Sequence, residues 1–131
     1  MREIHGNTTG IRDSFLEQLK ELYEFPVGSD EFLPPELAGL LAVATARINR
    51  EISVYISRAG EVLDVSIGYV DNVHLSELRL RRSRERLSMV RCVHTHPGGD
   101  AQLSEVDLTA LKTLWLDAMC AFGISADGEV T

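Results

Sequence analysis

The sequence predicts an α/β fold in which helices flank a mixed β-sheet. Two amphipathic stretches with helical spacing come first, and short stretches with the patterns of strands follow them. The chain of 131 residues has the length of one domain and is long enough to bury about two-thirds of its unfolded surface. We therefore expect a single domain over residues 1–131.

The first part of the chain has the pattern of two helices. A short extended piece over residues 2–5 leads into a turn-rich segment over residues 6–10. Apolar side chains then recur at helical spacing over residues 11–23, which predicts an amphipathic helix. After a break set by prolines and a glycine, a second apolar stripe predicts a helix over residues 36–49.

The middle of the chain changes to the patterns of strands. Apolar and polar residues alternate over 52–57, and a glycine turn separates this strand from a return strand over 62–70, as in a hairpin. The apolar run over 87–94 is typical of a buried strand, which Pro97 and the two glycines after it bring to an end. These patterns predict three strands of a mixed sheet.

The last part returns to helical spacing before a final strand. Ser104 has the character of a helix N-cap, and the apolar positions after it predict a helix over 105–119. Residues 121–124 have the composition of one more strand. The chain stops soon afterwards with a further strand barely begun, and we expect it to be one domain of a longer protein.

Composition and charge exclude several classes of protein. Apolar residues make up 44% and charged residues 25% of the chain, as in ordinary globular domains. The net charge of −7 argues against attraction of nucleic acid to the whole surface. No apolar run approaches the roughly 20 residues that span a bilayer, and the N-terminus lacks the apolar core of a signal peptide. We therefore expect a cytoplasmic protein without a membrane partner. In that compartment we expect Cys92 and Cys120 to be buried thiols.

Basic residues are concentrated in one stretch of this acidic chain. Six of the thirteen lie within thirteen positions: Arg79, Arg81, Arg82, Arg84, Arg86 and Arg91. The pattern is typical of a solvated loop or helix face, and a patch that contacts phosphate groups is the alternative.

A histidine pair and a nearby acidic residue predict a metal site. His94 and His96 lie two residues apart at the end of a predicted strand, so their side chains share one face. The loop after them returns to the helix that Ser104 opens, with Asp107 in its first turn. Two imidazoles and one carboxylate leave a fourth tetrahedral position for water, which is the open pattern of catalytic zinc. Nitrogen and oxygen ligands admit other divalent metals, and zinc is the commonest among them.

A second interpretation explains part of this pattern without a metal. Ser104 and Asp107 have the spacing of a capping box, in which the side chains satisfy the first amides of a helix. Capping does not explain why two histidines share a strand face one loop upstream. His5 and His74 have no partners at ligand spacing, and we expect neither to be a ligand.

Hydrolysis at such a site requires a base that takes a proton from water. Glu51 is the best candidate, because it precedes the first long strand and shares a face with Ser53 and Tyr55. The alternative is that Glu51 is an exposed carboxylate at a helix-to-strand junction. Glu61, in the predicted hairpin turn, is a weaker candidate.

These residues resemble a known motif. The pattern His-x-His-x7-Ser-x-x-Asp, with a glutamate some forty residues upstream, is similar to the JAMM motif of the MPN/JAB domains. The proline and glycines after the second histidine are similar to the RadC-like branch of that family. The resemblance implies zinc ligands at His94, His96 and Asp107, a catalytic acid/base at Glu51, and stabilisation of the tetrahedral intermediate by Ser104. It also implies a JAB/MPN-like fold with cytidine-deaminase-like layering.

A second resemblance extends over almost the whole chain. Residues 3–11, 49–54, 93–111 and 116–117 are similar to the extra N-terminal domain of HflX-type GTPases. This resemblance implies an accessory domain whose partners are the rest of the GTPase chain and, through the full-length protein, the ribosome. The 131 residues contain no phosphate loop of the form G-x-x-x-x-G-K-[ST], so GTP and magnesium would bind only in a G domain outside them.

Two functions therefore remain open from the sequence. In the first, the chain is a regulatory domain of an HflX-type GTPase that carries a JAMM-like zinc site, with a helical lead-in over residues 1–35 and a JAMM-like core over residues 36–131. In the second, the domain is an active zinc-dependent hydrolase that cleaves amide or isopeptide bonds. The arginine-rich stretch could contact ribosomal RNA in the first case, through Arg81, Arg82, Arg84 and Arg86. A third interpretation has no metal site: Ser104 and Asp107 only cap a helix, and the two histidines are incidental.

Overall fold

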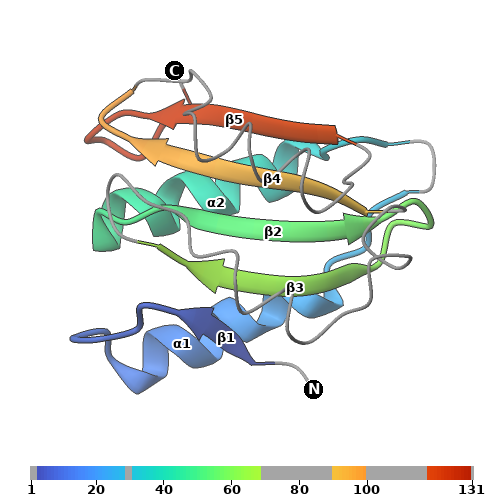
Figure 1. Cartoon of the computed structure of the whole chain (residues 1–131). Coiled ribbons are helices and arrows are strands. Elements are labelled where there is room, and N and C mark those ends of the chain that lie inside the picture. Colours follow the sequence, from blue (N-terminus) through green and yellow to red (C-terminus); the bar gives the residue numbers. More distant parts are fainter. Residues whose placement is uncertain (1–2, 29–30, 69–89, 100–117, 131) are drawn as a thin grey trace.

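A computed structural model describes residues 3–28, 31–68, 90–99 and 118–130, and within them it shows a mixed five-stranded sheet (Figure 1). The strand order is β1-β3-β2-β4-β5, with β2 antiparallel to β3 and β4, β1 parallel to β3, and β5 parallel to β4. The elements in chain order are β1 (Ile4–Gly6), α1 (Asp13–Lys20), the 3-10 helix η1 (Glu21–Glu24), α2 (Pro35–Ile48), β2 (Ile52–Ser57), β3 (Val62–Ile67), β4 (Val90–Pro97) and β5 (Ala118–Ile124). The predicted α/β class is confirmed.

The described helices cover one face of the sheet. In Figure 1, α1 and α2 lie behind the strands. Strand register aligns Val65, Val54 and Val93 across β3, β2 and β4, and all three belong to the same buried cluster as Leu37 and Leu41 of α2. Because strand side chains alternate between faces, the residues next to each of these valines along its strand point to the other side of the sheet.

Local chemistry fixes the ends of α2. Pro35 occupies its first turn, where the missing amide hydrogen costs nothing. Asn49 ends the helix in the left-handed conformation, at φ 53°, and donates its amide to the carbonyl of Thr45. The helix predicted over 36–49 is therefore confirmed to within one residue at each end, and it delivers the chain to Glu51 and the start of β2.

Several predicted boundaries differ from the structure. The first helix is shorter than the predicted 11–23, since it changes to 3-10 geometry at Glu21. Strand β4 continues to Pro97, beyond the predicted 87–94, and β3 ends at Ile67 rather than at residue 70. The prediction that Ala118 and Met119 end a helix is wrong, because both pair with β4 in strand β5. The remainder of the helix predicted over 105–119 lies outside the described residues.

Arg91 fits neither interpretation of the arginine-rich stretch, because it belongs neither to a solvated face nor to a patch that contacts phosphate groups. It is buried in β4, and its guanidinium donates to the carbonyls of Phe32, Ser57 and Glu31 at 2.9, 3.0 and 2.8 Å. Its role is therefore to hold the segment before α2 against the sheet. The other five arginines lie outside the described residues. No helix in the described part of the chain is long and apolar enough to cross a membrane.

Candidate metal centre

The sheet face away from α1 and α2 carries a row of buried polar side chains. Strand register aligns His5 of β1 with Ser66 of β3, Ser66 with Ser53 of β2, and Ser53 with His94 of β4. Ser53, Ser66 and His94 are all buried. Buried polar groups destabilise a fold unless they form hydrogen bonds, so their concentration on one face is typical of a functional site.

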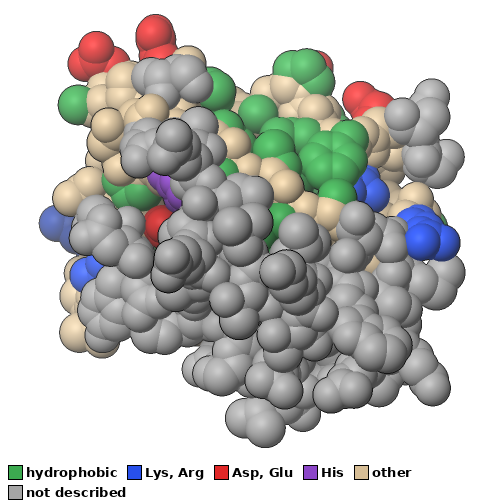
Figure 2. All heavy atoms as spheres, turned by 45° about the horizontal axis from the view of Figure 1, so that its top comes forward, with side chains coloured by type: hydrophobic (Ala, Val, Ile, Leu, Met, Phe, Trp, Pro, Cys, Tyr) green, Lys and Arg blue, Asp and Glu red, His purple; other side chains and the backbone are tan. Residues whose placement is uncertain are grey.

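The two histidines lie where β4 approaches its end. His94 is completely buried, and the side chain of His96 is 12% exposed. Their ring centroids are 4.8 Å apart and the ring planes are tilted by 53°. In the space-filling view, histidine reaches the surface in one small area beside an acidic side chain (Figure 2). The two rings are therefore close enough to bind one metal ion, and solvent reaches the pair at His96.

Glu51 lies directly beside this pair. The antiparallel register that aligns Ser53 with His94 puts Glu51 opposite His96 when it is continued by two residues. The Oε1 atom of Glu51 is 3.7 Å from Nε2 of His96. Glu51 is only 5% exposed, so the alternative of a solvent-exposed carboxylate is wrong. Glu61 is exposed and follows the other end of β2, far along the strand from Glu51.

A buried threonine connects the three side chains to the rest of the fold. Thr95 lies between the histidines and faces the helices, where its Oγ1 is 2.6 Å from Oγ1 of Thr45 on α2. The same Oγ1 accepts a hydrogen bond of 3.0 Å from the amide of Ile52, the residue after Glu51. Thr45 and Thr95 are both fully buried. One hydroxyl thus links the backbone of the histidine strand to the backbone of the glutamate, and nothing in the sequence pattern had marked it.

His5 belongs to a different network on the same face. Its Nδ1 is 3.1 Å from Oδ1 of Asp64, and the hydroxyl of Ser66 donates to Oδ2 of Asp64 at 2.9 Å. Two strands separate His5 from His94 in the sheet order. The expectation that His5 is not a ligand of the predicted site is consistent with this separation.

The side chains at the site have the donor chemistry that zinc requires. Imidazole nitrogens such as those of His94 and His96 bind zinc at about 2.0–2.1 Å. The carboxylate of Glu51, 3.7 Å from His96, is near enough to exchange a proton with a water molecule bound beside that histidine. Among the described residues, however, no group of three or more His, Cys, Asp or Glu side chains is arranged to hold a metal ion. The predicted third ligand, Asp107, and the predicted oxyanion helper, Ser104, lie outside the described residues. Arg81, Arg82, Arg84 and Arg86 lie outside them as well.

The described cysteines do not contribute to this chemistry. Cys92 is buried in β4, and both cysteines are free thiols. Burial raises the pKa of the Cys120 thiol above its ordinary value, because desolvation disfavours the thiolate. A protonated thiol is a poor nucleophile and a poor metal ligand, so Cys120 acts as a small apolar residue of β5.

Comparison of the chain with protein-family models, with curated proteins and with solved structures found no match. Its function is therefore inferred from the residues and from their geometry.

Proposed function

We propose that this domain holds a zinc site of the JAMM type and uses it to hydrolyse amide or isopeptide bonds. The observation that carries the proposal is the buried carboxylate of Glu51 at 3.7 Å from His96, next to a second buried histidine. A zinc site with only a structural role has no need of a base beside its ligands. A carboxylate in that position favours the hydrolase.

The roles of the residues follow from their positions. His94, His96 and Asp107 would hold the metal, which supplies Lewis-acid activation of water and of the scissile carbonyl when bound. Glu51 would accept a proton from the attacking water and return it to the leaving nitrogen. Its burial keeps bulk water away from the carboxylate and strengthens its interaction with nearby cations. The resemblance to the JAMM motif gives Ser104 the stabilisation of the tetrahedral intermediate.

Metal content tests the site itself. We expect protein purified without a histidine tag to contain about one zinc per chain, and His94→Ala, His96→Ala and Asp107→Ala each to lose it. His5→Gln is the matched control, because it removes a histidine from the same sheet face outside the site, and it should keep the metal. A protein without stoichiometric zinc, or with unchanged zinc in the three ligand variants, would exclude a metal site here.

Glu51→Gln separates a hydrolase from a zinc site with a structural role. The amide is nearly the same size as the carboxylate but cannot take up the proton, so zinc should stay bound while hydrolysis is lost. The assay is cleavage of fluorogenic peptide and isopeptide substrates by the zinc-loaded protein. Equal cleavage by the parent protein and by Glu51→Gln would exclude Glu51 as the base and, with it, the mechanism proposed here.

A second candidate is an accessory domain of an HflX-type GTPase, which the resemblance over almost the whole chain favours. In this case the domain would act through the rest of that chain, in the cytoplasm and at the ribosome, with Arg81, Arg82, Arg84 and Arg86 touching ribosomal RNA. Co-sedimentation of the full-length protein with ribosomes tests it. Replacing the four arginines with glutamine should reduce co-sedimentation, whereas the control Lys20→Gln should not. Unchanged co-sedimentation of the four-arginine variant would exclude the RNA contact.

A further inference from the structure

Three arginines line one polar cavity on the helical side of this acidic protein. The cavity has a volume of about 550 Å³ and lies between the start of α1 and the end of α2. Arg12, Arg47 and Arg50 belong to its lining, which contains no acidic residue. With a net charge of −7 over the whole chain, three uncompensated cations in one place are unexpected without an anionic ligand.

Neutral groups hold two of these guanidinium groups in place. Arg50 donates through Nη1 to the carbonyl of Asn7 at 3.1 Å. The guanidinium carbon of Arg47 lies 5.4 Å from the centre of the Phe15 ring, which is a cation–π contact. Among the described residues, no carboxylate forms an ion pair with Arg12, Arg47 or Arg50. The charges are thus positioned but not neutralised.

The first turn of α1 adds to the positive potential. Arg12 is its N-cap residue and makes no capping hydrogen bond with its side chain. Arg12 and Ser14 both line the cavity, so the cavity lies beside the amide end of the helix, where the potential is positive. Asp13 of the same turn lines a separate hollow with Glu17 and Lys20 instead. Among the described residues, therefore, no carboxylate fills the cavity.

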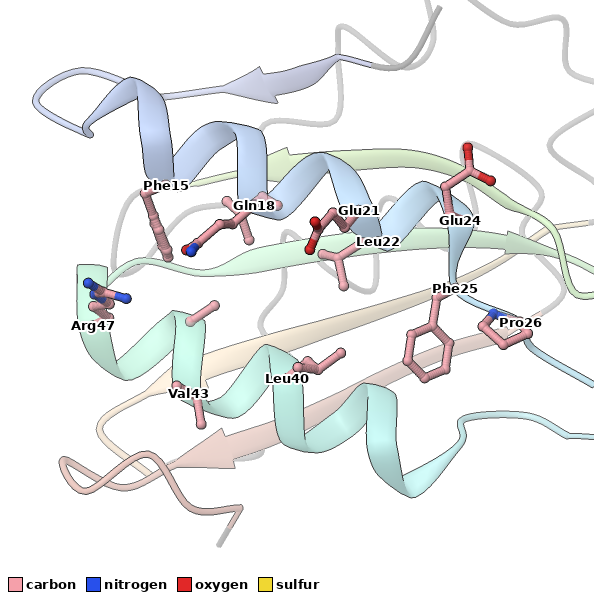
Figure 3. Close-up of a pocket in the computed structure, with 12 residues that line it drawn as sticks. Phe15, Gln18, Glu21, Leu22, Glu24, Phe25, Pro26, Leu40, Val43 and Arg47 are labelled. Atoms are coloured by element: carbon pink, nitrogen blue, oxygen red, sulfur yellow. The ribbon is translucent and has the colours of Figure 1, made fainter.

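An apolar groove continues from this cavity between α1–η1 and α2 (Figure 3). It has a volume of about 510 Å³ and shares Phe15, Gln18 and Arg47 with the arginine cavity. Leu40 and Val43 line the groove and are 52% and 60% exposed, among the most exposed large apolar side chains of the described residues. In Figure 3, Arg47 lies at one end of the groove, and Phe25 and Pro26 lie at the other.

We propose that the cavity and the groove together bind an amphiphilic organic phosphate, with the phosphate at the three arginines and the apolar chain along α2. Guanidinium groups bind phosphate through paired, charge-assisted hydrogen bonds. Three positive charges suit a phosphate dianion better than they suit a carboxylate, which carries one negative charge. Glu21 and Glu24 line the groove away from the arginines and repel a phosphate there, so the ligand has one orientation. The apolar chain covers the exposed surface of Leu40 and Val43.

Calorimetric titration of the whole chain with decyl phosphate, below the concentration at which it forms micelles, tests this site. Decyl phosphate should bind at least about tenfold more tightly than propyl phosphate, because the apolar chain adds buried area. Decyltrimethylammonium, which has the same chain and the opposite charge, should not bind. Equal binding of the two decyl compounds would mean a nonspecific apolar surface and would overturn the proposal.

Matched variants separate the two parts of the site. Arg12→Gln and Arg47→Gln should each weaken the binding of both phosphates about tenfold, because each removes a charged hydrogen bond. Leu40→Gln should weaken decyl phosphate alone. Lys20→Gln and Val130→Gln, which remove a cation and an exposed apolar side chain elsewhere, should change neither.

A monomer–dimer equilibrium that Leu40→Gln abolishes, without binding of decyl phosphate, would assign the groove to a second copy of the chain and overturn the proposal. Tighter binding of an RNA oligonucleotide than of decyl phosphate would overturn it too.

Discussion

Thr95 is the residue whose replacement most directly tests how the fold positions the candidate site. Thr95→Val keeps the shape of the side chain and replaces its hydroxyl with a methyl group. The hydroxyl that is lost accepts from the amide of Ile52 at 3.0 Å and lies 2.6 Å from the hydroxyl of Thr45, inside a fully buried region. The substitution therefore leaves the Ile52 amide and the Thr45 hydroxyl without this hydrogen-bond partner, while the packing stays almost unchanged.

The size of the effect follows from these two groups. A buried group that loses its hydrogen bond costs about 1–3 kcal/mol. The hydroxyl of Thr45 can turn to a carbonyl of its own helix, whereas the amide of Ile52 has no such freedom, so the amide carries most of the loss. We expect the free energy of unfolding to fall by about 2–3 kcal/mol. With an unfolding entropy of about 2.1 cal/mol/K per residue over 131 residues, the melting temperature should fall by about 10 °C.

Urea denaturation followed by circular dichroism measures this change, and related variants serve as controls. Thr95→Ser keeps both hydrogen bonds and should cost less than about 1 kcal/mol, mainly for the missing methyl group. Thr45→Val should cost less than Thr95→Val, since it leaves the amide of Ile52 satisfied. In the double variant the two hydroxyls are removed together, so its cost should be smaller than the sum of the single costs.

The same variants should affect the metal if the proposed site exists. Thr95 fixes the strand backbone between His94 and His96, and its partner Ile52 follows Glu51. Residues that orient ligands from behind typically change metal affinity by about tenfold to a hundredfold. Zinc affinity should therefore fall about tenfold in Thr95→Val and recover in Thr95→Ser. A loss of less than about 1 kcal/mol in Thr95→Val, or equal losses in the valine and serine variants, would refute the positioning role of this hydroxyl.

Three further predictions concern single positions. Gly60 has a φ of +90° and a side-chain carbon there would lie 2.1 Å from the carbonyl oxygen of Val27, so Gly60→Ala should lower the free energy of unfolding by more than about 2 kcal/mol in urea denaturation. Gly39→Ala, in an exposed turn of α2 with open space around the new methyl group, should instead raise it by about 0.5–1 kcal/mol; a loss there would contradict an exposed site. Because burial raises the pKa of Cys120, its thiolate fraction at a given pH is smaller than in the unfolded chain. In a Cys92→Ala background, its reaction with a thiol reagent should have a midpoint at higher pH in the native protein than in urea.

The sequence predicts an element well where local chemistry ends it. The helix over 36–49 agrees with α2 because Pro35 and Asn49 leave little freedom at its ends. The start of β5 was missed for the opposite reason. Its residues, Ala118 to Ile124, are all apolar or glycine, and such a run has neither helical nor strand periodicity. What makes it a strand is pairing with β4, a contact between segments distant in the sequence.

The candidate site shows the same division. That His94 and His96 share a face follows from the alternation of a strand and needs no other information. That Glu51 lies opposite His96 depends on the register between β2 and β4, which the sequence alone does not define. The roles of Thr45 and Thr95 depend in addition on the packing of α2 against the sheet, so no local pattern could have identified them.

The two faces of the sheet differ in a way that bears on function. One face places Val65, Val54 and Val93 in a row beneath the helices, and the register one residue along places Ser66, Ser53 and His94 in a row on the other face. Both rows are buried. Apolar residues in the second row would stabilise the fold more, since burial of polar groups opposes folding. A sequence that departs from local preference over a whole face is expected where chemistry requires it. Since His94 belongs to this row and Glu51 and His96 lie at the end of the same face, the polar row extends into the predicted site.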